Sequence, residues 1–230
     1  MRRNFLKKGE SLIEVIIAIS IVAMGSAVAT SLIVNALQSN QFSRDNLIAL
    51  NLAVEGIEAV RSVRDANWVK FSYDKEKCWN MRPEVGDCLA APKPIAEGKY
   101  TVDLDLKANN YGWVLPNLPI GTALDLDLPL NNSAPYHLFY YDIDGAKNSD
   151  GKGNNTDDHD LLATNVNTPW VIKSGESKFY RMVQIHYQPN GAPADPAFDV
   201  VSTVEWKAQG VTHKVELSTR LTNYQKVKTP

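Results

Sequence analysis

The chain of 230 residues is long enough for one globular core of ordinary size, or for a stalk that carries one domain, but too short for two full domains. Its formal net charge of -2 gives no general attraction to nucleic acid or to anionic lipid, because both partners require clustered excess lysine and arginine. The bulk charge therefore implies neither partner, and a nucleic-acid ligand is disfavoured.

The N-terminal region combines a short basic segment with a long apolar run. The run extends from Leu12 to Leu37, and the basic residues before it are Arg2, Arg3, Lys7 and Lys8. At about 1.5 Å per helical residue, this length crosses a hydrocarbon core of about 30 Å. The positive-inside rule predicts that the first nine residues stay cytoplasmic and that the rest is exported. A conventional secretory signal is disfavoured because its apolar core is shorter, about 7 to 15 residues.

Glu14 places a carboxylate just inside this apolar run, three residues after Ser11. A charge at the bilayer centre costs about 2.5 to 3.5 kcal/mol, and less near the interface, so its presence invites a functional explanation. The alternative is that Glu14 reaches the headgroups at the start of the helix, where an acid also suits the helix dipole. The residues alone leave both interpretations open.

The segment around this acid resembles the type III signal of type IV prepilins and type II secretion pseudopilins; it reads Lys7-Lys8-Gly9-Glu10-Ser11-Leu12-Ile13-Glu14-Val15. The resemblance implies that a prepilin peptidase cuts after Gly9 and methylates the new N-terminus at Glu10. It also implies that Glu14 pairs with the terminal amine of a neighbouring subunit. Such a pair of opposite charges in an apolar filament core can set the axial register during assembly.

Beyond Leu37 the sequence becomes more polar but keeps a helical period. Apolar residues recur at spacings of three and four, which predicts an amphipathic helix that ends near Asn67 and faces a partner surface with Leu47, Leu50, Val54, Ile57 and Val60. A coiled-coil stalk is disfavoured because sustained heptads do not persist. The pilin plan then implies a leader (1–9), a transmembrane or filament-core helix (10–37), an amphipathic helix (38–67) and a β-rich head (68–230).

After Trp68 the apolar period changes to two, which is typical of half-buried strands. The clearest alternation runs from Tyr100 to Leu106. Further strands are predicted at Leu124–Leu128, His137–Ile143, Phe179–Tyr187, Val200–Lys207 and His213–Leu221. The last two flank Ala208, Gln209 and Gly210, which predicts an antiparallel hairpin whose inward face carries Val215, Leu217, Thr219 and Leu221. The expected fold is α+β and pilin-like, with a long N-terminal helix packed on an antiparallel sheet.

Cys78 and Cys88 are the two cysteines of the chain and lie close together in a loop-like stretch. Export predicts a local disulfide, whereas a reducing compartment would leave two thiols. A zinc site is disfavoured because the pair lacks further ligands.

A glycine-rich segment carries hard oxygen ligands of the kind that calcium prefers, on Asp142, Asp144, Asn148, Asp150, Asp157 and Asp158. Solvated turns are rich in the same residues for conformational reasons, so both interpretations stay open. No cofactor is otherwise expected. The four histidines are dispersed, and the sequence lacks a nucleophile elbow or a phosphate-binding loop, so an enzyme is disfavoured.

The leading hypothesis is a structural filament subunit, with a minor pilin preferred because the segments Arg61–Trp68 and Leu217–Tyr224 resemble parts of minor-pilin heads. The alternatives are a tip adhesin, a DNA-binding minor pilin and a type II secretion pseudopilin. The expected partners are the prepilin peptidase, other pilin subunits and the membrane. The expected location is the bacterial cytoplasmic membrane, with the N-terminus cytoplasmic, and then an extracytoplasmic filament.

Overall fold

The computed structural model describes residues 12–105, 112–119, 137–142, 160–163, 172–187 and 197–223. The chain divides into an N-terminal unit, Met1–Asn46, and a head unit, Leu47–Pro230. Helix α1 (Leu12–Lys70) contributes to both units and ends three residues beyond the predicted position. Each unit is described by itself below.

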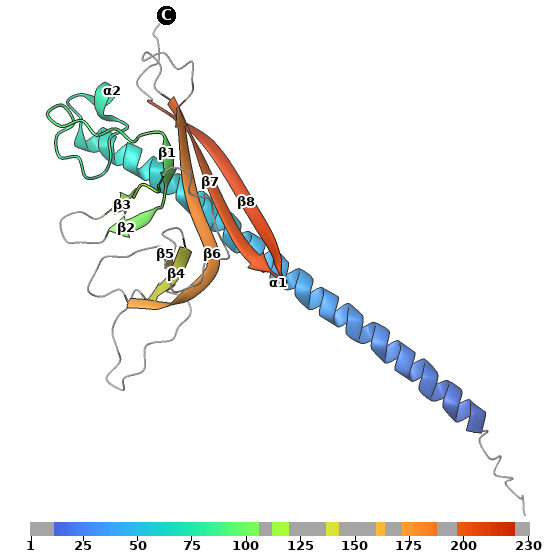
Figure 1. Ribbon diagram of the computed structural model, residues 1–230. Helices are drawn as coiled ribbons and strands as arrows, with labels where there is room; N and C mark the ends of the chain where they lie inside the picture. The colour runs from blue at the N-terminus through green and yellow to red at the C-terminus, as the bar shows by residue number, and fades with distance from the viewer. Residues whose placement is uncertain are drawn as a thin grey trace, which may run out of the picture. The chain divides into compact units, whose positions relative to one another are not determined.

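The head unit contains an antiparallel sheet and a smaller strand pair (Figure 1). The main sheet has the order β5 (Asp160–Ala163), β4 (His137–Asp142), β6 (Ile172–Tyr187), β7 (Ala197–Ala208) and β8 (Val211–Thr222), and β1 (Gly98–Tyr100) also pairs with β6. The smaller pair joins β2 (Asp103–Asp105) to β3 (Gly112–Val114), and a short helix, α2 (Lys75–Cys78), precedes β1. This α+β arrangement of a long helix and an antiparallel sheet confirms the expected class and is consistent with a pilin-like fold.

The predicted C-terminal hairpin is confirmed as β7 and β8, which pair without interruption from Ala208 and Val211 to the far end. Its turn consists of Gln209 and Gly210, whose φ angles are 53° and 76°. Two consecutive positive φ angles define a type I′ turn, whose twist matches that of the flanking strands. The predicted inward face is also confirmed, because Leu221 is buried and the alternate residues Val215, Leu217 and Thr219 are half-buried.

The strand predicted from Tyr100 to Leu106 is divided in the structure. β1 belongs to the main sheet, whereas β2 pairs with β3. Between them, Thr101 and Val102 are buried, and the Thr101 N–H donates to the Pro116 carbonyl at 3.0 Å. The chain therefore changes sheets in the middle of a regular alternation, a change that the period of two does not reveal. The strand predicted at Leu124–Leu128 lies outside the described residues.

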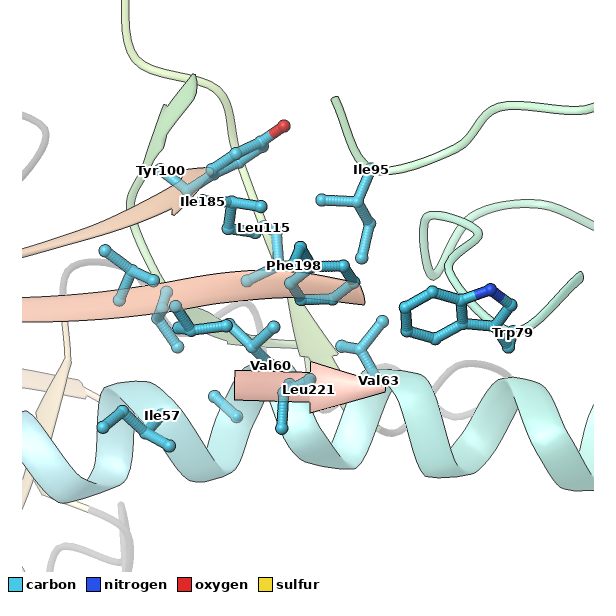
Figure 2. Close-up of a cluster of buried hydrophobic side chains, with 14 residues drawn as sticks. Ile57, Val60, Val63, Trp79, Ile95, Tyr100, Leu115, Ile185, Phe198 and Leu221 are labelled. Carbon is cyan, nitrogen blue, oxygen red and sulfur yellow. The ribbon is translucent and has the colours of Figure 1, made fainter. Parts of the chain in front are cut away.

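The main core lies between the head part of α1 and the sheet (Figure 2). Ile57, Val60 and Val63 of the helix share a buried cluster with Phe198 and Leu221 of the C-terminal hairpin. The indole of Trp79 extends this cluster by stacking on the Phe198 ring at 5.2 Å between centroids. A second cluster gathers Ala49, Leu52, Ala53, Leu138, Phe179, Val204 and Trp206.

The predicted helical stripe is only partly the buried one. Ile57 and Val60 are buried, but Leu47, Leu50 and Val54 are 60%, 38% and 43% exposed. Instead, the buried Ala49 and Ala53 lie on the side of α1 that packs against the sheet. Small side chains there let the helix approach the sheet closely, and a hydrophobicity pattern gives them little weight.

Candidate functional site

Of the three residues predicted for processing and assembly, Gly9, Glu10 and Glu14, the structure describes only Glu14. Gly9 and Glu10 lie outside the described residues. Glu14 lies in the first turn of α1, within the N-terminal unit. Its carboxylate is the only ionisable side chain between Leu12 and Ser43.

The part of α1 in the N-terminal unit exposes its apolar side chains on every face. An 18-residue stretch of α1 has a mean hydropathy of 2.4 and contributes nothing to a buried core. In the N-terminal unit, the hydroxyls of Ser20, Ser26 and Thr30 on α1 donate to backbone carbonyls of the preceding turn at 2.8–2.9 Å. These hydroxyls therefore do not need water as an acceptor, and the helix is long and apolar enough to anchor in a membrane.

The chemistry available to Glu14 follows from these surroundings. An ionised carboxylate in an apolar medium requires a compensating partner, since the cost of removing it from water is otherwise large. A primary amine from another chain supplies both the opposite charge and hydrogen-bond donors. The lone acid can therefore recognise a cation presented within the same apolar layer.

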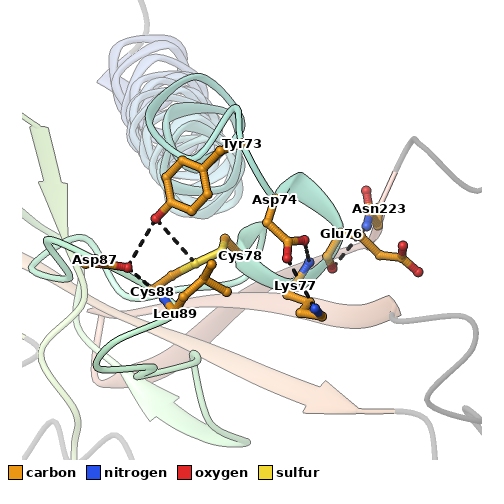
Figure 3. Close-up of polar contacts among 9 residues, drawn as sticks. All are labelled: Tyr73, Asp74, Glu76, Lys77, Cys78, Asp87, Cys88, Leu89 and Asn223. Carbon is orange, nitrogen blue, oxygen red and sulfur yellow. Dashed lines mark hydrogen bonds and ion pairs between the residues drawn. A yellow bond between two sulfur atoms is a disulfide. The ribbon is translucent and has the colours of Figure 1, made fainter.

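A disulfide closes a loop at the end of α1 in the head unit (Figure 3). Cys78 and Cys88 are bonded, with a distance of 5.8 Å between their Cα atoms, as predicted for an exported head. Beside the disulfide, the carboxylate of Asp87 accepts hydrogen bonds from the N–H groups of Leu89 and Ala90 at 2.9 and 3.2 Å. These bonds lower the pKa of Asp87 below its usual range. Desolvation and the nearby Asp87 charge raise the pKa of the Tyr73 phenol, whose hydroxyl lies 3.3 Å from that carboxylate.

Two helix side chains attach this loop to α1. The amide nitrogen of Asn67 donates to the carbonyls of Trp79 and Met81 at 3.3 and 2.5 Å. The ammonium group of Lys70 donates to the carbonyl of Val85. The disulfide and these hydrogen bonds together hold the loop against the last turns of the helix.

The proposed calcium ligands fall almost wholly outside the described residues. Asp142 is the last residue of β4, and the other five candidates, Asp144, Asn148, Asp150, Asp157 and Asp158, lie in 143–159. Within the described ranges, no three acidic, histidine or cysteine side chains come together as metal ligands. Calcium binding by the 142–158 segment therefore stays a prediction.

Three histidines lie in the described part of the chain and make structural contacts. His137 is buried, stacks on Tyr180 and lies 2.6 Å from the carbonyl of Ser177. His213 stacks on Trp206, and His186 pairs with Glu97 at 3.2 Å.

A buried ion pair connects α1 to the sheet and was not predicted. The guanidinium of Arg181, which is 1% exposed, lies 3.1 Å from the carboxylate of Glu55. It also donates to the carbonyls of Leu52 and Val102 at 3.3 and 3.1 Å. The sequence signal was an arginine within the otherwise apolar centre of β6, where a charge requires a partner.

Comparisons of the chain with models of known protein families, with curated proteins and with solved structures find no match.

Proposed function

We propose that the chain is a structural subunit of a type IV pilus or a related filament, matured by a prepilin peptidase that cuts after Gly9. The observation that carries the proposal is the exposed apolar part of α1, in which Glu14 is the only ionisable side chain from Leu12 to Ser43. Lipid would cover this surface before assembly, and the helices of other subunits would cover it afterwards.

In this proposal the Glu14 carboxylate pairs with the terminal amine of a neighbouring subunit. Cleavage between Gly9 and Glu10 produces this amine. Arrangements of the subunits that leave either the acid or the amine unpaired in the apolar layer are disfavoured, because an unpaired charge there is costly. The pair would therefore select one axial register. The proposal assigns the chain a structural role, with no reaction of its own and no required cofactor.

The remaining features agree with this role. The head unit would be exported, and the Cys78–Cys88 disulfide is a bond that oxidising compartments favour. The N-terminus would stay cytoplasmic because of the basic residues that precede the helix. The same chemistry serves a pilus subunit and a type II secretion pseudopilin, so the proposal extends to both.

The test is the N-terminal mass of the full chain produced with and without a prepilin peptidase. We expect loss of residues 1–9 only when the peptidase is present, and no loss in the Gly9→Val variant. The matched control is Gly25→Val, because the added side chain has no neighbour within 4 Å and should leave cleavage unchanged. An uncut wild-type chain under both conditions would overturn the proposal.

A further inference from the structure

A cavity of about 330 Å³ lies in the head unit between the last turns of α1, the disulfide-closed loop and β3. This volume is at the lower end of the range for small-molecule sites, about 300 to 1,000 Å³, and suits one ring-sized group. The lining residues that carry the argument are Ser62, Ala66, Asn67, Lys70, Pro83 and Trp113. Figure 1 shows β3 beside the same stretch of helix.

Asn67 brings a buried, oriented hydrogen-bond acceptor to this cavity. The residue is 3% exposed, and its amide nitrogen is held by the carbonyls of Trp79 and Met81. These two bonds fix the plane of the amide, and its Oδ1 atom accepts no hydrogen bond from any described residue. A ligand hydroxyl is the kind of donor that would satisfy this oxygen, and the Ser62 hydroxyl on the same wall adds a second polar contact.

Lys70 gives the cavity its charge. It is the one charged side chain among the described lining residues, and none of them is an acid. Its ammonium group has three N–H donors, and the Val85 carbonyl takes one of them. The remaining donors favour an anionic group on the ligand, and the two oxygens of a carboxylate can accept both of them.

The other walls of the cavity are apolar and partly rigid. Trp113 is half-buried and packs on the main core, which fixes one part of the indole and leaves another part accessible. Pro83 and the small side chain of Ala66 complete the apolar lining. An indole surface of this kind stacks on the apolar face of a ring.

We propose that this cavity binds a carboxylated pyranose, that is, a uronic or sialic acid unit of a glycan. The ring lies against Trp113, the carboxylate accepts hydrogen bonds from Lys70, and a ring hydroxyl donates to Asn67. A sugar is favoured over an apolar peptide side chain because the α1 wall of the cavity presents a hydroxyl, an amide and an ammonium group, on Ser62, Asn67 and Lys70. The site belongs to the head unit alone, so it operates in an unassembled chain, whether or not the chain forms filaments.

The test is calorimetric titration of the full chain in a detergent without sugar headgroups, using the methyl glycosides of glucuronic acid, N-acetylneuraminic acid and glucose. We expect saturable binding of at least one acidic glycoside and weaker binding of the neutral one. Lys70→Met should weaken acidic binding by about tenfold or more and leave the neutral glycoside unchanged. The matched control is Lys75→Met, since Lys75 is not among the lining residues.

A second variant, Trp113→Ala, should remove binding of both kinds of glycoside, while Tyr73→Ala, an exposed aromatic outside the lining, should not. Thermal unfolding and the disulfide state report whether each variant is folded. Absence of saturable binding in the wild type, or equal affinity in Trp113→Ala, would overturn the proposal. Binding of an aromatic dipeptide, with no binding of any glycoside, would identify a peptide site and overturn it as well.

Discussion

Gly56 of α1 faces Ser202 of β7 so closely that a Cβ atom placed on the glycine would lie 2.5 Å from the serine hydroxyl oxygen. Ser202 is fully buried, and its hydroxyl has no hydrogen-bond partner in the described part of the chain. The contact fixes how closely the helix approaches the sheet, and the absence of a side chain at Gly56 makes it possible.

We expect Gly56→Ala to destabilise the head by about 1 to 3 kcal/mol, because the added methyl group overpacks a dense contact. Chemical denaturation of the full chain in detergent measures the change. The double variant Gly56→Ala/Ser202→Gly should recover most of the loss, since the nearest clashing atom is the Ser202 hydroxyl oxygen and the next, the Val183 Cγ2 atom, is farther away at 3.1 Å. No recovery would place the strain elsewhere.

The ion pair between Glu55 and Arg181 predicts a large effect from one substitution. Glu55→Gln keeps the size of the side chain but leaves the Arg181 guanidinium buried without its counter-ion. Removing one partner of a buried pair costs about 3 to 5 kcal/mol, and the partial exposure of Glu55 places the expected loss near the lower value. The control is Glu58→Gln, whose exposed pair with Arg61 should contribute less than about 1 kcal/mol. Equal effects of the two variants would contradict the prediction.

The disulfide should contribute to stability through the loop that it closes. Cys78→Ser/Cys88→Ser should lower the free energy of unfolding by about 2 to 4 kcal/mol, because the unfolded chain regains conformational freedom. Reducing the wild type should produce a similar loss, and reducing the double variant should change nothing further. Val69→Ser serves as a control, since Val69 is 80% exposed. An unchanged double variant would show that Asn67 and Lys70 hold the loop without the bond.

The lowered pKa of Asp87 predicts a pH-dependent contribution from the same loop. A carboxyl group whose pKa is depressed by folding contributes stability above its unfolded pKa, about 3.9, and loses it as the pH falls through the folded value. Asp87→Asn keeps an acceptor oxygen but cannot ionise. The difference in melting temperature between wild type and variant should therefore be largest near neutral pH and should shrink below about pH 4. A difference independent of pH would assign the effect to geometry alone.

Glu14 provides the test of assembly within the proposed function. Glu14→Ala should still be cleaved by the prepilin peptidase but should fail to enter filaments, because the terminal amine of the neighbour loses its partner. The control is Ser20→Ala, which removes a hydroxyl already bonded to its own helix. Immunoblotting of sheared filaments against membrane fractions measures incorporation. Normal incorporation of Glu14→Ala would remove this role from the residue.

Features that depend on neighbouring residues were predictable from the sequence. The helix from Leu12, its apolar run and the hairpin around Gln209–Gly210 arise from local periodicity and turn chemistry. Both depend only on residues that are close in the sequence. The disulfide between Cys78 and Cys88 was expected from the sequence as well, as the one cysteine pair of a chain whose head was predicted to be exported.

Only the tertiary structure decided which side of α1 is buried, where the chain leaves the main sheet after Tyr100, and how Arg181 reaches Glu55. It also brought Asn67, Lys70 and Trp113 around one cavity. Each of these depends on pairing and packing between residues that are distant in sequence. Their energies come from the fit of surfaces, and a one-dimensional pattern of polarity does not encode that fit.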